Sequence, residues 1–327
     1  MLEYIVNSLR AILISCKIVI YRQKIPRQME PSFHGDLRIL LLPDLPAVCR
    51  HAECGSAKEL NNIERGRRFH MARREHFVQI YDLHTHTTMS DGHVSIDDLV
   101  AWEHGMGHQL GVSDHVFYEG IFTERDIAAY LEVLRRYPVY RGIEANMEHH
   151  FALPDSLDTQ IDYVIASIHN MPDGRGGMIP MDSFFKKRSG NMPGYTKNYS
   201  SDLNRWYLAH SLRLIEKALA NERIDILGHI TLMPCCDELY GTKFLLDWEN
   251  AVLNLCRRHC VALEISGLWR LPNMEMLRRA KEMGILFSMG SDCHEAKDVG
   301  VLDYCKLAVD TIGLSEEDFF VPARALY

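Results

Sequence analysis

Seven short apolar runs, each followed by a segment of helical character, constrain the fold of this chain more than any other feature. The runs lie at about 77–83, 110–113, 139–143, 163–168, 225–228, 261–265 and 285–289. They are continuously hydrophobic rather than alternating, which indicates strands that are buried on both faces. Successive strand-then-helix units predict a parallel sheet with right-handed crossovers. We therefore expect an α/β protein, an irregular (β/α)7 barrel.

Signals for helix ends separate these strands. Ser95 with Asp98, and Thr123 with Asp126, have the spacing of N-terminal capping boxes. The predicted helices cover about 95–105, 123–134, 202–220, 244–258, 274–283 and 302–311. Residues 170–198 are rich in Gly, Pro and Met, and we predict a long loop there.

The first 70 residues do not share this pattern. The apolar run 11–21 is interrupted by Lys17 and is too short to span a membrane. We expect residues 1–70 to be an N-terminal extension that is poorly ordered, or that precedes a true start at Met71, and residues 71–327 to form the catalytic domain. A basic amphipathic anchor over residues 1–24 is the alternative.

Charge and cysteine usage narrow the function. Residues 1–70 carry 11 Lys+Arg against 7 Asp+Glu, so residues 71–327 carry 25 against 37. An acidic body argues against wrapping of long nucleic acid, but bound cations can still attract a phosphorylated substrate. The nine cysteines contain no C-x-x-C pair, and no run reaches the roughly 18 apolar residues of a membrane span. These features favour a reducing cytoplasm.

The candidate functional residues are imidazoles and carboxylates at the ends of the predicted strands. His84 and His86 stand two apart, so both side chains project to one side of an extended backbone, and Asp91 follows after a short turn. Such a pair alone is weak evidence for a metal site, because histidines on strands are often only packed in the core or exposed to solvent. The full set is His84, His86, Asp91, His115, Glu144, His169, His229, Asp292 and His294. In a β/α barrel all of these strand ends meet at one face, so the set predicts two or three divalent ions, with zinc, manganese or iron suited to the ligands.

The motifs that contain these residues resemble the PHP family, named for polymerase and histidinol phosphatase. They are His84-x-His86-(x4)-Asp91, Ser113-Asp114-His115, Gly142-Ile143-Glu144-Ala145-Asn146, Ser167-Ile168-His169, Leu227-Gly228-His229 and Gly290-Ser291-Asp292-x-His294. The resemblance covers about residues 80–300 and is greatest to the histidinol-phosphatase branch. It implies a TIM-barrel-like PHP fold and a metal-dependent hydrolase that acts on a small phosphomonoester.

Carried over position by position, the resemblance implies three groups of ligands. One metal would be held by His84, His86, Glu144 and Asp292, which are also the implied catalytic residues. Glu144 would bridge to a second metal, held with His169 and His229. The third group is Asp91, His115 and His294. Some family members have a histidine one residue after the position of Asp91. We expect this difference to alter the metal preference of the third site or to weaken metal binding there. The implied nucleophile is a hydroxide that the metals generate from water.

Recognition of the substrate is less constrained by the sequence. Arg270, after the sixth predicted strand, and Arg175, in the predicted 170–198 loop, are candidates for binding phosphate. For Trp269 core packing is the favoured role over lining a pocket. Asp114 and Glu264 either orient the imidazoles of the ligands or form buried hydrogen bonds near the rim of the barrel. Cys293 is expected to point away from the ligands on either side of it.

Three other functions compete with a phosphomonoesterase. The first is a PHP-type exonuclease or nucleotide phosphodiesterase, which the acidic body disfavours. The second is a metal-dependent amidohydrolase, although many of these need a lysine at a strand end and no predicted strand here ends in lysine. The third is a non-catalytic metal-binding barrel. The sequence leaves the substrate, the metal and the oligomeric state open.

Overall fold

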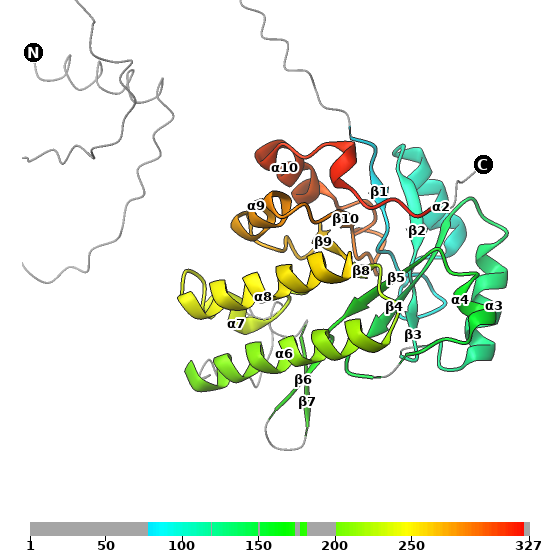
Figure 1. Cartoon of the computed structure of the whole chain (residues 1–327). Helices are drawn as coiled ribbons and strands as arrows, with labels where there is room; N and C mark the ends of the chain where they lie inside the picture. Colours follow the sequence, from blue (N-terminus) through cyan, green and yellow to red (C-terminus); the bar gives the residue numbers. More distant parts are fainter. Residues whose placement is uncertain (1–77, 119, 150, 174–176, 182–200, 324–327) are drawn as a thin grey trace, which may run out of the picture. The chain divides into compact units, whose positions relative to one another are not determined.

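The computed structural model describes residues 78–118, 120–149, 151–173, 177–181 and 201–323 (Figure 1). The predicted extension 1–70 and the predicted start at Met71 lie outside these residues. In the part of the chain that is described, every helix is too short or too polar to cross a membrane.

Seven parallel strands close into a barrel. The strands are β1 (Tyr81–Asp82), β2 (Gln109–Val112), β4 (Tyr140–Asn146), β5 (Tyr163–Ser167), β8 (Ile226–Leu227), β9 (Ala262–Ser266) and β10 (Phe287–Gly290). Hydrogen-bonded neighbours follow the order β2-β1-β10-β9-β8-β5-β4, and β4 pairs with β2 to complete the ring. A short strand β3 (His115–Val116) follows β2 and also pairs with β4. The prediction of a seven-unit barrel is confirmed.

Helices surround the barrel (Figure 1). The longer ones are α2 (Ile96–Gly105), α3 (Glu124–Leu134), α6 (Ser201–Asn221), α8 (Lys243–His259), α9 (Met274–Glu282) and α10 (Asp303–Ile312). The shorter ones are α4 (Asp155–Asp158), α7 (Pro234–Glu238) and the 3-10 helix η4 (Glu316–Asp318). The two predicted caps are present: the Ser95 hydroxyl accepts from the backbone N–H of Asp98, and Thr123 and Asp126 cap each other reciprocally.

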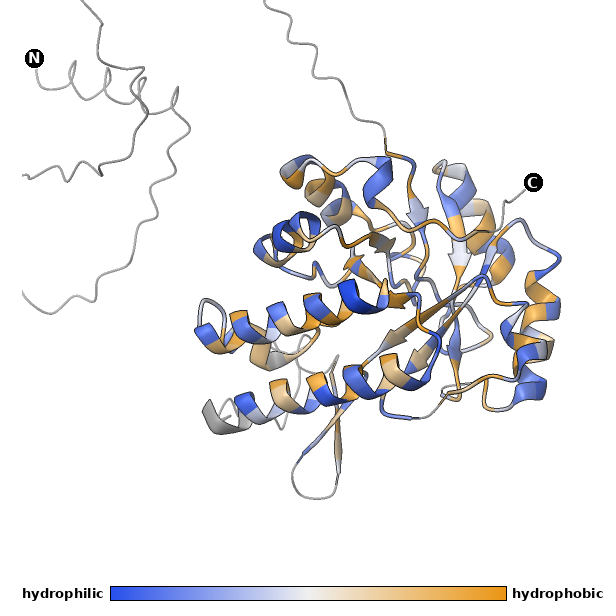
Figure 2. Cartoon of the chain, viewed as in Figure 1, coloured by the Kyte–Doolittle hydropathy of each residue, from blue (hydrophilic) through white to orange (hydrophobic). Residues whose placement is uncertain are grey.

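The alternation of side chains along the strands produces two hydrophobic clusters. Val164 and Ala166 of β5 belong to the large core, together with apolar residues of the surrounding helices. The hydrophobic residues of these helices are orange in Figure 2. Tyr163 and Ile165 of the same strand belong to the second cluster. The members of this inner cluster are Leu83, Tyr140, Tyr163, Ile165, Ile226 and Ala262. Because both faces of each strand are buried, the strands read as continuous apolar runs in the sequence.

Tyr163 fills the interior of the barrel. Its side chain is fully buried, and its hydroxyl donates to the carbonyl oxygen of Leu83. A Cβ at Gly142 would stand 2.2 Å from the Cζ atom of Tyr163, so only glycine leaves space for the ring. The inner cluster is therefore a packed core, as in other parallel barrels.

The predicted end of the third strand was wrong. The third strand does not end at residue 143: β4 continues to Asn146, and Glu144 pairs in register with His115 and Ile165. A charged side chain interrupts the apolar run, but the backbone at Glu144 still needs partners inside the barrel wall.

The predicted 170–198 loop contains a hairpin. Strands β6 (Asn170–Pro172) and β7 (Met178–Pro180) pair antiparallel, with Met171 and Ile179 buried. The Asp173 side chain accepts from the backbone N–H of Gly177 and helps to hold the two strands together. Residues 174–176 and 182–198 of that predicted loop lie outside the described residues.

Candidate metal centre

The nine imidazoles and carboxylates singled out by the strand-end pattern lie in one cluster at the carboxyl ends of the strands. Each of them has a side-chain nitrogen or oxygen within 3.3 Å of another member. His84, His169, His229 and Asp292 are each the second residue after the end of a strand. The barrel thus gathers residues that are up to 210 positions apart, from His84 to His294, at one face.

Glu144 lies at the centre of the cluster and is 1% exposed. Its Oε2 atom faces three imidazoles: His84 Nε2 at 3.2 Å, His86 Nε2 at 3.4 Å and His115 Nδ1 at 3.1 Å. Its Oε1 atom faces two others, His169 Nε2 at 3.1 Å and His229 Nε2 at 3.3 Å. The two oxygens of one carboxylate therefore address two different sets of nitrogen donors.

Asp292 is a second carboxylate that faces His84 and His86. Its Oδ1 atom lies 3.2 Å from His86 Nε2 and 3.5 Å from His84 Nε2. The backbone of Asp292 has φ of 54°, in the left-handed region that non-glycine residues rarely adopt. Its backbone N–H donates to the carbonyl oxygen of His84 at 2.7 Å, which ties the β1 and β10 ends together.

Asp91 forms the outer part of the cluster. Its Oδ2 atom lies 3.1 Å from His294 Nε2 and 3.7 Å from His115 Nε2, and its Oδ1 atom lies 3.7 Å from His86 Nδ1. The two ring nitrogens of His115 thus face Asp91 and Glu144. This part is more open: the side chains of Asp91 and His294 are 25% and 31% exposed.

The carboxylates are ionised despite their burial. Desolvation raises the pKa of Glu144, but the charges of His84, His169 and His115 outweigh it and hold the pKa well below its usual value. Desolvation likewise opposes ionisation of Asp292, but the neighbouring imidazoles, above all that of His84, outweigh it and hold its pKa well below the usual value. Two negative charges are thus present in a nearly dry pocket at neutral pH.

Many polar atoms of the cluster lack hydrogen bonds within the described residues. They are both oxygens of Glu144, both ring nitrogens of His86, Nε2 of His84, Nδ1 of His115 and Nδ1 of His229. Buried polar atoms without partners are costly and rare. Overlapping groups of three or four donors, with ligand atoms within 4.8 Å of one another, could each hold an ion: His86-Asp91-His115-His294, His84-His86-Glu144, His84-His229-Asp292 and His115-Glu144-His169. The donor set therefore fits divalent metal ions.

Neighbouring side chains orient these donors. Glu264 lies with Oε1 2.7 Å from His84 Nδ1, and its Oε2 accepts from the backbone N–H of His229. Asn146 pairs with Nδ1 of His169. Glu264 thus has the orienting role considered from the sequence. The other candidate, Asp114, instead holds the turn after His86, because it accepts from the N–H and hydroxyl of Thr87.

The predicted substrate residues have different positions. Arg270 is exposed, and its guanidinium carbon lies 5.1 Å from the ring centroid of Tyr304. Arg175 lies outside the described residues. Cys293 is fully buried in the large hydrophobic core. Trp269 is packed against that core as expected, but its indole N–H also donates to Asp292 Oδ2, a contact that the sequence pattern did not indicate.

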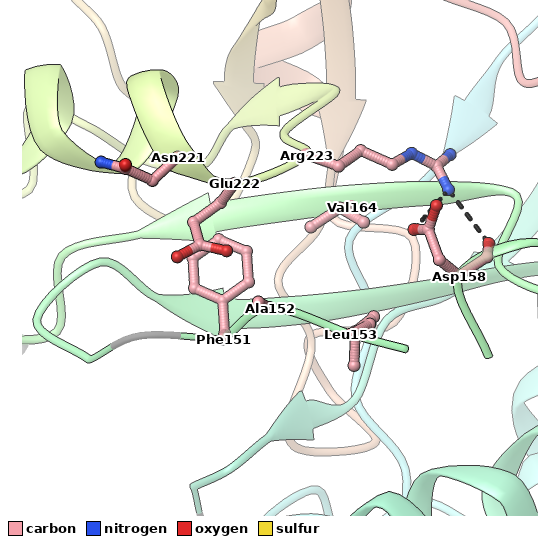
Figure 3. Close-up of a pocket in the computed structure, with 8 residues that line it drawn as sticks. All are labelled: Phe151, Ala152, Leu153, Asp158, Val164, Asn221, Glu222 and Arg223. Atoms are coloured by element: carbon pink, nitrogen blue, oxygen red, sulfur yellow. Dashed lines mark hydrogen bonds and ion pairs between the residues drawn. The ribbon is translucent and has the colours of Figure 1, made fainter. Parts of the chain in front are cut away.

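A separate hollow of about 160 Å³ lies on the outside of the barrel (Figure 3). It is lined by Phe151, Ala152, Leu153, Asp158, Val164, Asn221, Glu222 and Arg223. Arg223 is committed to the Asp158 carboxylate at 3.0 Å and the Asp225 carboxylate at 3.1 Å. None of the nine clustered residues lines this hollow, so it is not part of the candidate metal centre.

Comparisons with known proteins match this arrangement. The family model described as the PHP domain matches residues 82–265. A protein of Vibrio vulnificus named as a probable phosphatase is 29% identical over 188 residues, which are 54% of this chain and 59% of the relative. The chain thus spans less than two thirds of that relative.

Two solved structures share the fold. One is a Listeria monocytogenes protein assigned as a histidinol phosphatase, with a TM-score of 0.53, 18% identity, and coverage of 67% of this chain and 97% of that one. The other is histidinol phosphate phosphatase from Lactococcus lactis, complexed with zinc, L-histidinol and phosphate. Its TM-score is 0.50, at 15% identity, with coverage of 75% of this chain and all of that one.

Proposed function

The chain belongs to the PHP domain family, and from that premise we propose that it is a metal-dependent phosphoesterase that hydrolyses a small phosphomonoester. The observation that carries the proposal is the position of Glu144, whose two buried oxygens face two different sets of imidazoles. A carboxylate in that position is suited to bridge two cations about 3.5–4 Å apart, the spacing used in phosphoryl transfer.

The ligands divide between two or three divalent ions. His84, His86, Glu144 and Asp292 would hold the first, and Glu144 with His169 and His229 the second. Asp91, His115 and His294 would hold a third. The mixture of imidazole and carboxylate donors suits zinc, manganese or iron.

Bound ions would supply Lewis-acid charge for the phosphoryl oxygens and lower the pKa of the attacking water. The protein's own contribution is a rigid ligand frame, in which Glu264 fixes the His84 ring through Nδ1. Cys293 does not supply a nucleophile, because burial raises the pKa of its thiol and its side chain packs in the core.

Arg270 is the proposed phosphate-binding residue. It is exposed at the rim, directly after Trp269, which contacts Asp292. The left-handed backbone of Arg270, with φ of 56°, sets the direction in which its side chain leaves the loop. The Tyr304 ring lies beneath its guanidinium. A planar guanidinium can donate two parallel hydrogen bonds to a phosphate, which a lysine cannot reproduce. Replacement by lysine is therefore expected to raise KM while the metal content stays unchanged. Arg175 remains a second candidate from the sequence.

The proposal is tested with metal-reconstituted protein on p-nitrophenyl phosphate and bis-p-nitrophenyl phosphate. We expect preferential hydrolysis of the monoester. Preference for the diester would instead support the exonuclease or nucleotide phosphodiesterase alternative. A panel of phosphorylated metabolites, including histidinol phosphate, would then identify the substrate class.

Two variants test the site itself. His84→Ala and Asp292→Asn are expected to lose hydrolysis and bound metal, because the first removes a nitrogen donor and the second removes the negative charge of a ligand. His104→Ala is the matched control, since His104 is an exposed histidine on α2. Full activity and metal content in either ligand variant would defeat the proposal.

A further inference from the structure

We propose that Trp269 is a positioning residue of the metal centre: its indole N–H holds Oδ2 of Asp292 so that Oδ1 alone is presented to the metal beside His84 and His86. The inference rests on the proposed metal-dependent function. It assigns a role to a residue for which the sequence pattern favoured core packing.

The contact divides the two oxygens of Asp292. Trp269 Nε1 donates to Oδ2, which lies 4.0 Å from His229 Nε2. Oδ1 lies closer to its imidazoles, 3.2 Å from His86 Nε2 and 3.5 Å from His84 Nε2. An oxygen that already accepts from an indole is a poorer metal ligand, and the carboxylate can no longer turn freely about its Cβ–Cγ bond. The hydrogen bond therefore favours coordination through one oxygen and fixes its direction.

Asp292 needs such a tether because its backbone is strained. A non-glycine residue in the left-handed region is strained and persists only when its surroundings hold it. The backbone N–H bond to the His84 carbonyl holds the main chain at Asp292. The indole of Trp269 provides a second restraint, on the side chain.

The loop that carries Trp269 is itself rigid. The backbone N–H of Ser266 donates to the carbonyl of Leu271 at 2.9 Å, which closes the loop after β9. Gly267 packs so closely that a Cβ there would lie 1.9 Å from the carbonyl oxygen of Val301. The Trp269 ring is half-buried against the large core. A donor fixed in this way can orient a ligand without rearranging when metal binds.

The first test is metal affinity in Trp269→Phe, which keeps an aromatic ring and removes the N–H. We expect the affinity for Zn²⁺ or Mn²⁺ to fall by about 10- to 100-fold, the usual effect of removing a partner of a metal ligand. The unfolding temperature of the metal-free protein is expected to change little. Trp102→Phe is the control, because Trp102 is 43% exposed on α2. An affinity in Trp269→Phe equal to that of the wild type would overturn the proposal.

A second measurement uses the wild-type sequence and does not depend on the folding of that variant. The chain has four tryptophans, so four indole N–H signals are expected in the NMR spectrum of protein labelled with 15N-tryptophan. The signals are assigned by replacing Trp102, Trp206 and Trp248 one at a time, which identifies that of Trp269 by elimination. Addition of Zn²⁺ is expected to shift the Trp269 signal most.

The outcomes separate the two proposals. Wild-type protein that binds no divalent ion would refute the proposed function together with this inference. Wild-type protein that binds metal while the Trp269 signal stays in place would refute the positioning role alone. A shift at Trp269 with weakened binding in Trp269→Phe would support both.

Discussion

Inside the barrel, the six side chains of the inner hydrophobic cluster and the nine of the candidate metal centre occupy successive layers but are stabilised in different ways. The inner hydrophobic cluster is complete in itself: its rings and alkyl groups fill the space, and the Tyr163 hydroxyl has an acceptor. The candidate metal centre has buried oxygens and nitrogens without hydrogen-bond partners in the described residues. The first layer stabilises the fold, whereas the second is arranged for ions that the fold itself does not provide.

The largest effect is expected from Glu144→Gln. Two proposed ions share this carboxylate, so its neutral analogue should lose most of the bound metal and reduce hydrolysis to background. Metal per chain, measured by mass spectrometry of the elements, and hydrolysis of p-nitrophenyl phosphate check this. The circular dichroism spectrum should stay the same, because the inner hydrophobic cluster is untouched. A variant that retains its metal and activity would remove the distinction between the two layers.

Tyr163→Ala probes the other layer. Removal of a fully buried ring should lower the free energy of unfolding by about 3–5 kcal/mol, as for other large aromatic side chains in cores. Urea unfolding of the metal-free protein measures it. Tyr240→Ala, at a 63% exposed position, is the control and should stay within about 0.5 kcal/mol of the wild type. If both variants unfolded like the wild type, the inner cluster would not be the stabilising layer.

Removal of metal gives the next effect in size. Metal present at about 100 times its dissociation constant stabilises a folded protein by about 2.7 kcal/mol, so a chelator should lower the unfolding midpoint accordingly. Tyr163→Ala should show the same increment as the wild type, because its change lies in the other layer. Glu144→Gln should show little. Differential scanning calorimetry with and without EDTA distinguishes these cases.

The smallest effect is the dependence of metal binding on pH. Burial lowers the pKa of His294, but its hydrogen bond with Asp91 and the charge of Asp292 outweigh it and raise the pKa to about 9. Metal must then displace a proton, so affinity should rise with pH up to about 9, by at most about tenfold per unit for one proton.

In the metal-free protein the sign is reversed. The raised pKa of His294 stabilises the fold below the ordinary value of 6.5, and this contribution disappears as the pH rises through about 9.

Mn²⁺ titrations followed by electron paramagnetic resonance between pH 6.5 and 8.5 test the prediction for binding. An affinity that does not change with pH would show that protonated imidazoles do not compete with the metal.

The barrel could be predicted from the sequence because its strands are buried on both faces, which leaves an unmistakable series of apolar runs. The ligand set could be predicted for a related reason. His84, His169, His229 and Asp292 each follow a strand at the same offset, so the strand pattern alone brings them to one face.

Other features depend on contacts that a linear pattern does not contain. The hydrogen bond from Trp269 to Asp292 is accompanied by left-handed backbone at Arg270 and at Asp292, and neither residue is a glycine. The extension of β4 through Glu144 requires that a charged side chain be accepted in the barrel wall, which imidazoles from other strands make possible. Both depend on residues more than 20 positions away.

The Tyr163 ring also determines how molecules reach the chemistry. It fills the barrel interior, which blocks passage along the barrel axis to the candidate metal centre. Under the proposed function, the phosphate ester, the attacking water and the two products would therefore approach and leave from the carboxyl ends of the strands. Turnover would then depend on how quickly the products are released, and inorganic phosphate that stays bound would compete with the next substrate molecule.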